Sequence, residues 1–361
     1  MEPAADNPAP RGNRTHIAFF GLRNAGKSTL VNAFTNSPIA IVSDVPGTTT
    51  DPVSKAMEIL PLGPCTITDT AGLDDDAGEL GALRVKKTLD VLKTADIAVW
   101  VGEGFERWRE KFNIPVVQYR RGESVDELKR KIAAMKSGEG RMKVLDGLVE
   151  AGALVLCVCP IDESAPKGRL ILPQQQVLRE CLDAHAAAIV CQPQEVAAVC
   201  AKTQVDLAIT DSQAFGEVRR ALPPHVKLTS FSILFARAKG DLESYLAGLE
   251  AVGKLRDGDL VVIAEGCVHH RQCNDIGTVK IPKALERLAE CKLSFRFLSG
   301  NAFNEDELDG AALMVQCGGC MLTRRETMAR IAAAKEKGVP VVNYGMLLAK
   351  AQGVDVEGAM P

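Results

Sequence analysis

The segment Gly21–Ser28 has the residue types and spacing of a phosphate-binding loop. It matches G-x-x-x-x-G-K-S and lies between an apolar run and the helix-like run Thr29–Phe34. Glycines let successive backbone N–H groups turn towards phosphates, and a helix N-terminus adds partial positive charge. Lys27 would neutralise the outer phosphates. The sequence therefore predicts a nucleotide site formed by Gly21, Asn24, Ala25, Gly26, Lys27, Ser28 and Thr29, with Ser28 as a Mg2+ ligand.

Two downstream segments have the order expected of a nucleotide triphosphatase. Asp69-Thr-Ala-Gly72 ends a second apolar run, where the aspartate would hold Mg2+ through water and the Gly72 amide would meet the γ-phosphate. Between them, the loop Pro46–Asp51 supplies Thr48 and Thr49, and a threonine there could complete the magnesium shell when a γ-phosphate is bound. We assign the catalytic roles to Lys27, Asp69 and Thr49.

These motifs resemble the translation-factor class of GTPases, especially those that employ potassium. By that resemblance GTP is the nucleotide and Asn24 is the K+ ligand. Leu73 follows Gly72, so no side chain there can orient the attacking water, and the bound cation would stand in for an arginine finger. We therefore expect any hydrolysis to be slow.

The residues that read guanine are missing from their expected place. The apolar run 114–119 is followed by Arg120-Arg121-Gly122-Glu123 instead of Asn-Lys-x-Asp, and Val125–Met135 has the pattern of a terminal amphipathic helix. The similar spacing Lys239-Gly-Asp241 lies far outside this region and is interpreted as a solvated charge pair. The domain is thus predicted to be one βα unit short, which leaves guanine specificity open.

A second group of residues has the chemistry of a metal site. Cys267-Val-His269 and Cys317-Gly-Gly-Cys320 each follow an apolar run. Because the carboxyl ends of parallel strands share one edge of a sheet, the two segments could converge on one metal. Three thiolates with one exchangeable position suit an iron-sulfur cluster, and Cys3His suits structural zinc equally well. A redox dithiol is a third reading, although it leaves Cys267 and His269 unexplained.

The elements that must position these residues alternate between strand-like and helix-like patterns, which indicates an α/β fold with mainly parallel sheets. So many strands need more than one sheet. We predict a P-loop GTPase-like domain at 15–140 after a disordered N-terminus at 1–14, followed by two further α/β domains at 141–238 and 239–361. The strands are expected near residues 16–21, 64–69, 96–101, 114–119, 152–159, 187–191, 205–210, 226–230, 258–264, 293–298, 311–316 and 339–343.

Composition narrows the classes of partner. Lysine plus arginine (43) nearly balances aspartate plus glutamate (46), and no basic stripe with interleaved aromatics is present, so no nucleic-acid partner is expected. No apolar stretch is long enough to cross a bilayer and no lipidation motif is found, so no membrane partner is expected either. The eleven cysteines without a secretory signal argue against a disulfide framework. We therefore expect a cytoplasmic protein.

Nearly the whole length of the chain resembles the HydF family of FeFe-hydrogenase maturation GTPases. The stretches that carry the resemblance are Val42–Val53, Ala165–Gln174, Leu228–Ala236, Cys267–His270 and Cys317–Leu322. The resemblance implies a dimerisation domain at 141–238 and a domain at 239–361 in which Cys267, Cys317 and Cys320 hold a 4Fe-4S cluster. His269 or an exchangeable group would complete the cluster.

The same resemblance implies a scaffold that receives a diiron precursor from radical-SAM maturases and delivers it to apo FeFe-hydrogenase, with the nucleotide as a switch and a homodimer as the assembly. This chain departs from the family at Gln316, where histidine often precedes Cys-x-x-Cys, and at the missing guanine-reading unit. Two alternatives stay open: a regulatory G-domain switch with a structural zinc site, and a scaffold whose G domain no longer hydrolyses nucleotide.

Overall fold

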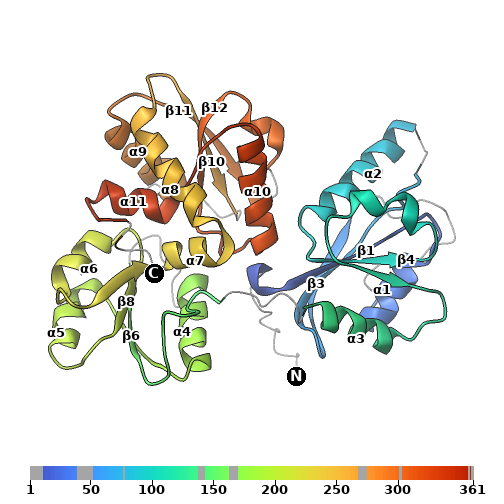
Figure 1. The fold of residues 1–361 in the computed structure, drawn as a ribbon, viewed down its shortest axis with the longest axis horizontal. Coiled ribbons are helices and arrows are strands. Elements are labelled where there is room, and N and C mark those ends of the chain that lie inside the picture. The colour runs from blue at the N-terminus through green and yellow to red at the C-terminus, as the bar shows by residue number, and fades with distance from the viewer. Residues whose placement is uncertain are drawn as a thin grey trace, which may run out of the picture. The chain divides into compact units, whose positions relative to one another are not determined.

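The computed structural model describes residues 11–38, 52–75, 78–136, 143–161, 170–266, 275–300, 303–356 and 358. The chain divides into two compact units, Met1–Arg141 and Met142–Pro361. Figure 1 shows helices flanking a sheet in the first unit and two sheets in the second. Each unit is considered by itself below.

The described part of the first unit contains a five-stranded sheet in the order β2-β3-β1-β4-β5. All neighbours are parallel except β2, which runs antiparallel to β3 at the edge. This order fits the expected P-loop domain that is one βα unit short, because β5 is the last strand before the final helix. The strands are β1 Thr15–Gly21, β2 Val53–Ile59, β3 Gly63–Asp69, β4 Ile97–Val101 and β5 Val116–Tyr119.

Helices cover both faces of this sheet, as the alternation along β1 requires. Ile17 and Phe19 pack with Phe34 of helix α1 and Ile132 of helix α3, whereas Phe20 packs on the opposite face with helix α2. The sheet therefore has a buried core on each side, which fixes the strand ends that carry the phosphate-binding motifs. The helices are α1 Lys27–Thr35, α2 Gly78–Leu92 and α3 Val125–Lys136.

The second unit contains two four-stranded parallel sheets with the same winding. Their orders are β7-β6-β8-β9 and β11-β10-β12-β13, so in each sheet the first strand of the series lies between the second and the third. The strands are β6 Leu154–Val158, β7 Ala187–Cys191, β8 Leu207–Thr210, β9 Lys227–Ser230, β10 Leu260–Glu265, β11 Ser294–Ser299, β12 Ala311–Gln316 and β13 Val341–Asn343.

One hydrophobic core runs through both sheets of this unit, from Val158 and Phe215 to Ile263 and Met346. Helix α8 lies so close to β13 that a Cβ at Gly248 would come within 1.9 Å of the Val341 carbonyl oxygen, so only glycine fits there. The helices are α4 Leu172–Asp183, α5 Val196–Cys200, α6 Phe215–Ala221, α7 Phe231–Lys239, α8 Leu242–Ala251, α9 Ile281–Ala289, α10 Arg324–Glu336 and α11 Tyr344–Ala351.

The strands expected from the sequence are all present, with ends that differ by a few residues, and the prediction of mainly parallel sheets is confirmed. Strand β2 was not predicted, because most of its side chains are exposed and its pattern lacks an apolar run. Among the described residues, no helix has the length and apolar character that crossing a membrane requires. Short helical turns are Arg11–Asn13, Phe105–Arg107, Arg109–Lys111, Pro193–Glu195, Val252–Lys254, Ile276–Lys280 and Glu305–Leu308.

Candidate functional site

The phosphate loop connects the carboxyl end of β1 to the first turn of α1. Gly26 caps the helix with a left-handed backbone (φ 89°), and Asn24 also has a positive φ of 58°. A Cβ at Gly21 would stand 2.6 Å from the Val101 carbonyl oxygen of β4. The loop is therefore held by close backbone packing, and Ala25 and Thr29 lie in the loop and in the first helical turn, as the motif predicts.

Three predicted site residues meet at the base of this loop. Lys27 is only 7% exposed and its Nζ donates to the carbonyl oxygen of Leu22 at 2.7 Å. Ser28 Oγ donates to Asp69 Oδ2 at 2.6 Å. Asp69 is fully buried, and its Oδ1 has no hydrogen-bond partner among the described residues. Lysine, hydroxyl and carboxylate thus converge from α1 and β3.

Burial sets the electrostatics of this trio. It lowers the pKa of Lys27, and attraction from Asp69 and Asp74 opposes that shift. Burial also raises the pKa of Asp69, and the hydrogen bond from Ser28 and the charge of Lys27 oppose it. Both charges are held out of water, so either would gain from a partner of opposite charge.

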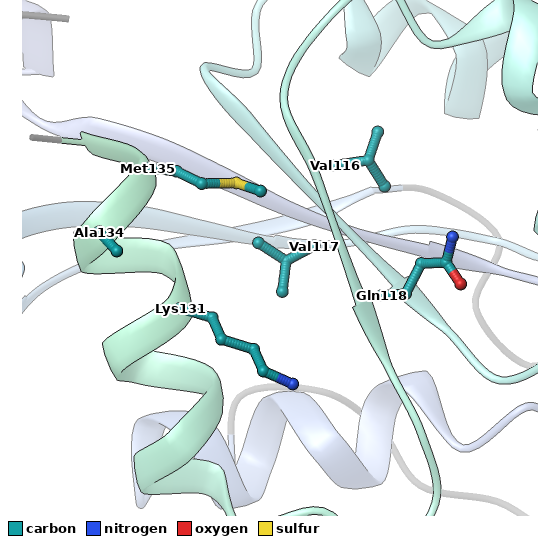
Figure 2. Close-up of a pocket in the computed structure, with 6 residues that line it drawn as sticks. All are labelled: Val116, Val117, Gln118, Lys131, Ala134 and Met135. Carbon is teal, nitrogen blue, oxygen red and sulfur yellow. The ribbon is translucent and has the colours of Figure 1, made fainter. Parts of the chain in front are cut away.

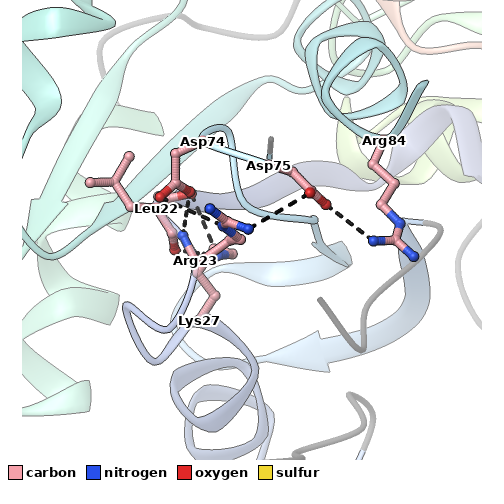
Figure 3. Close-up of polar contacts among 7 residues, drawn as sticks. Leu22, Arg23, Lys27, Asp74, Asp75 and Arg84 are labelled. Carbon is pink, nitrogen blue, oxygen red and sulfur yellow. Dashed lines mark hydrogen bonds and ion pairs between the residues drawn. The ribbon is translucent and has the colours of Figure 1, made fainter. Parts of the chain in front are cut away.

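An ion-pair network behind the loop was not predicted from the sequence. The backbone N–H of Arg23 donates to Asp74 Oδ1 at 2.6 Å, and its side chain lies 3.9 Å from both Asp74 and Asp75. Arg84 of α2 reaches Asp75 at 3.2 Å (Figure 3). Gly72 packs on Arg23, because a Cβ there would lie 2.7 Å from the Arg23 nitrogen. The network joins the phosphate loop to the segment after β3.

The turn after β5 uses its carboxylate internally. The Arg120 N–H donates to the Glu123 carboxylate at 3.3 Å, the Tyr119 hydroxyl donates to the Glu123 carbonyl at 3.0 Å, and Lys131 pairs with the Glu123 carboxylate. An open groove of about 540 Å3 lies along β5 and α3 (Figure 2). It contains no phosphate-loop residue, and its polar lining consists of Gln118 and Lys131.

The cysteine loop, residues Cys317–Leu322, follows strand β12. It lies at the carboxyl edge of the sheet β11-β10-β12-β13. Strands β10 and β12 are paired with Ala264 opposite Gln316, so the residues that follow them lie side by side. The Gly266 N–H donates to Cys317 Sγ at 3.1 Å, and the Cys317 N–H donates to the Ala264 carbonyl at 3.1 Å. Gly266, the last described residue before Cys267, therefore contacts the Cys317 thiol directly.

Buried cations flank the two thiols. Lys239, at the end of α7, is 6% exposed and its Nζ donates to the carbonyls of Gly319 at 3.1 Å and Leu322 at 2.8 Å. Arg330 of α10 donates to the Glu265 carbonyl at 3.3 Å. Burial, then repulsion from Cys317, raises the pKa of Cys320 to about 11, and Lys239 opposes the rise.

Arg330 likewise opposes the increase that burial causes in the pKa of Cys317.

The interpretation of Lys239 as a solvated charge pair with Asp241 was wrong. Asp241 pairs with the partly exposed Lys335 at 2.8 Å, while Lys239 is turned into the loop.

Four predicted residues, Thr48, Thr49, Cys267 and His269, lie outside the described residues. In the part of the chain that the structure describes, no three His, Cys, Asp or Glu side chains form a group able to hold a metal. Gln316 is fully buried, and within the same residues neither of its side-chain polar atoms has a partner.

Three families of known domains match consecutive parts of the chain. Residues 16–143 match the 50S ribosome-binding GTPase family. Residues 144–240 match the hydrogen maturase F dimerization domain, and residues 243–360 match the hydrogen maturase F tetramerization domain. The two sheets of the C-terminal unit thus correspond to two domains of one family.

Curated relatives resemble part of this chain. The tRNA modification GTPase MnmE of Zymomonas mobilis subsp. mobilis is 27% identical over 177 residues, covering 48% of this chain and 39% of that protein. MnmE of Phenylobacterium zucineum is 40% identical over 105 residues, covering 28% and 23%. The chain therefore spans less than half the length of either relative. A solved Era structure from Aquifex aeolicus, bound to GDP.AlF4-, covers 79% of this chain and 93% of its own at 16% identity, with a TM-score of 0.26.

Proposed function

Because the chain belongs to the hydrogen maturase F family, we propose that it is a scaffold and carrier for assembly of the FeFe-hydrogenase active-site cluster. In this proposal it acts in the cytoplasm, receives a diiron precursor from radical-SAM maturases and delivers it to the apo-hydrogenase. The N-terminal domain binds GTP with Mg2+ as a switch. The dimerization and tetramerization domains support self-association as part of the function.

The observation that carries the proposal is the hydrogen bond from the Gly266 N–H to Cys317 Sγ. It brings two segments far apart in sequence together at the edge of a parallel sheet, where ligand sites form. A backbone N–H directed at a sulfur is a contact that stabilises a thiolate, and it lies one residue before Cys267. The donors therefore fit a thiolate-bound cluster.

Cys267, Cys317 and Cys320 would hold the 4Fe-4S cluster. Such a cluster supplies one iron that three thiolates leave open, and His269 or an exchangeable group would occupy it until the diiron cargo arrives. The protein's own part is to position thiols and to offset their charge. Arg330 and Lys239 meet the second need, because each lies close enough to oppose the pKa rise of a cysteine.

In the N-terminal domain, Lys27 would pair with the outer phosphates, and Ser28 with Asp69 would hold Mg2+. Asp69 Oδ1 is buried and has no partner among the described residues, which supports this, because a metal-bound water would satisfy it. Thr48 and Thr49 would complete the site around the γ-phosphate, with Thr49 in a catalytic role. Asn24 is proposed as a K+ ligand, so turnover should be faster in potassium than in sodium.

The test is iron and zinc analysis of anaerobically purified protein, with absorption and paramagnetic resonance spectra. Each of the single variants Cys267→Ser, Cys317→Ser and Cys320→Ser should lose the cluster, and with it the ability to activate apo-hydrogenase. Cys291→Ser is the matched control, because this partly exposed cysteine lies in the bend after α9, near Asp257 and Asp259 before the start of β10. It should retain iron at the wild-type level.

Other outcomes separate the alternatives. Stoichiometric zinc without iron would replace the carrier with a regulatory G-domain switch that has a structural zinc site. An intact cluster with no nucleotide turnover would favour a scaffold whose G domain has lost hydrolysis. An unchanged cluster in the triple serine variant would overturn the assignment of all three cysteines.

A further inference from the structure

The two sheets of the C-terminal unit are related by more than their strand order. In the first sheet Thr210 at the end of β8 pairs with Ser230 at the end of β9. In the second, Gln316 at the end of β12 pairs with Asn343 at the end of β13. Position for position, the strand ends that bear the loops therefore correspond between the two domains.

The helices that follow these last strands also match in sequence. Ser230–Gly240 reads SFSILFARAKG and Asn343–Gly353 reads NYGMLLAKAQG, with the leucine, two alanines and the glycine at the same positions. Both helices start with a side-chain cap: the Ser230 side chain accepts a hydrogen bond from the Ile233 N–H, and the Asn343 side chain accepts one from the Gly345 N–H. The domains thus have the features of one duplicated module, in which Lys239 corresponds to Gln352.

Each copy of the module holds a loop of the other. Lys239 Nζ donates to three carbonyls of the loop after β12, those of Gly319, Cys320 and Leu322. Gln352 Nε2 donates to the Ser212 carbonyl in the loop after β8 at 2.6 Å, and its Oε1 accepts from the Gly216 N–H at 3.0 Å.

The helix starts repeat the exchange. A Cβ at Gly318 would meet Ser232 Oγ at 3.0 Å, and a Cβ at Gly345 would meet Ser212 Oγ at 3.0 Å. Since Ser232 corresponds to Gly345 and Ser212 to Gly318, the two contacts are equivalent. The contacts between the domains therefore follow a local two-fold relation.

The charge breaks this equivalence. A neutral glutamine satisfies backbone groups on one side, so hydrogen bonding alone does not require an ammonium on the other. Lys239 nevertheless has a charged group at 6% exposure, over the ring of Phe235 at 5.1 Å. Burying a charge costs free energy unless it has partners. The cation lies on the side whose loop contains two cysteines.

We propose that Lys239 is a positioning residue for the cysteine loop. It extends from the dimerization domain, fixes the Cys317–Leu322 backbone and places a positive charge beside the cluster. The inference rests on the proposed cluster site. It makes the geometry and reduction potential of that cluster depend on a residue of the neighbouring domain. Reduction adds negative charge to a cluster, so a fixed cation favours the reduced form.

The first test measures hydrogen exchange in the whole metal-free chain. Lys239→Met removes the donor and keeps the aliphatic stem, so amides of residues 317–323 should exchange roughly tenfold faster or more, because loss of even one of the three hydrogen bonds predicts an effect of that size. Lys239→Arg should restore protection. Gln352→Met is the matched control, and it should raise exchange at 212–216 alone. Unchanged exchange at 317–323 in Lys239→Met overturns the proposal.

The second test uses the same variants with reconstituted cluster. In Lys239→Met the ratio of reduced to oxidised cluster at a fixed potential should fall about tenfold, which is about 59 mV for one electron. Lys239→Arg and Gln352→Met should titrate like the wild type. Faster exchange with an unchanged potential would disprove the electrostatic role. If the wild-type protein takes up no iron, the proposed function is wrong. Hydrogen exchange would still decide whether Lys239 fixes the cysteine loop.

Discussion

The phosphate loop and the cysteine loop both leave the carboxyl end of a buried parallel strand, but they are assembled differently. In the phosphate loop, the consecutive residues from Gly21 to Ser28 make up most of the proposed nucleotide site, and Ser28 is hydrogen-bonded to Asp69 of the adjacent strand. The cysteine loop instead gathers Cys317 and Cys320, the segment after β10, and Lys239 from another domain.

The difference has a physical cause. Phosphate is bound by backbone N–H groups and a helix N-terminus, which a short contiguous segment can present. A cluster needs side-chain thiolates on several sides, so distant segments have to converge and their combined charge has to be offset. The first site is therefore stiff and local, and the second depends on how two domains pack.

Lys27→Ala should give the largest effect and should be confined to the phosphate site. Loss of a charge-assisted hydrogen bond costs about 3 kcal/mol, so triphosphate binding should weaken roughly 100-fold or more. Titration with a fluorescent GTP analogue measures this, with the exposed Lys86→Ala of α2 as control. Iron content should stay at the wild-type level. A parallel loss of iron would contradict the separation of the two sites.

A methyl group added to each loop should measure their difference in stiffness. In Gly21→Ala the new Cβ meets a backbone carbonyl at 2.6 Å, which should cost about 1–3 kcal/mol in the free energy of unfolding. In Gly318→Ala it meets the hydroxyl of Ser232 at 3.0 Å, a side chain that can rotate, so less than about 1 kcal/mol is expected.

Denaturant unfolding compares the two variants, with Gly253→Ala as a control that meets nothing within 4 Å. Equal costs at Gly21 and Gly318 would mean that the cysteine loop is as tightly packed as the phosphate loop.

The same contrast decides what could be predicted from the sequence. The residues of the phosphate loop are contiguous, so their spacing alone indicated the strand, the turn and the helix, and the structure has all three. The strands were predicted because most of them are buried apolar runs. Strand β2 has no such run, since it is an exposed edge, and it could only be found from its pairing with β3.

Lys239 shows what local patterns miss. Next to Asp241 it resembles a surface ion pair, and its burial arises only when α7 packs against the loop after β12. The ion pairs from Arg23 to Asp74 and Asp75 were missed for the same reason. The repeat of Ser230–Gly240 at Asn343–Gly353 is present in the sequence, but its two copies lie far apart and share only a leucine, two alanines and a glycine, so no local pattern indicates it.

Asp69→Asn should separate stability from function at the phosphate site. Burial raises the folded-state pKa of Asp69 above its unfolded value, so protonation favours the folded state and this stabilisation is lost as pH rises through the folded pKa. At pH 7 without Mg2+, asparagine should therefore stabilise the protein by about 1 kcal/mol.

The gain should fade as the pH falls through the folded-state pKa of Asp69, because the wild-type carboxyl then becomes protonated as well. Thermal unfolding across this range gives the result, and the exposed Asp90→Asn is the control. Mg2+-dependent GTP binding should be lost in Asp69→Asn. A gain that persists at low pH would show that charge is not its cause.

The smallest effect is expected for the nucleobase, in the difference between GTP and ATP binding. A site built to pair with guanine normally rejects the wrong base by about 10⁴-fold or more, because buried polar groups stay unpaired. Here the carboxylate after β5 belongs to Glu123, which already accepts from Arg120 and pairs with Lys131. GTP and ATP should therefore bind with affinities within about tenfold of each other, as expected when recognition resides in the shared phosphates.

Competition binding tests this, with Glu123→Gln as the matched variant. A strong GTP preference that Glu123→Gln abolishes would make this turn the guanine reader. A preference that survives the change would place the reader in another segment, and the nucleotide site would then be assembled from distant parts, as the cysteine loop is.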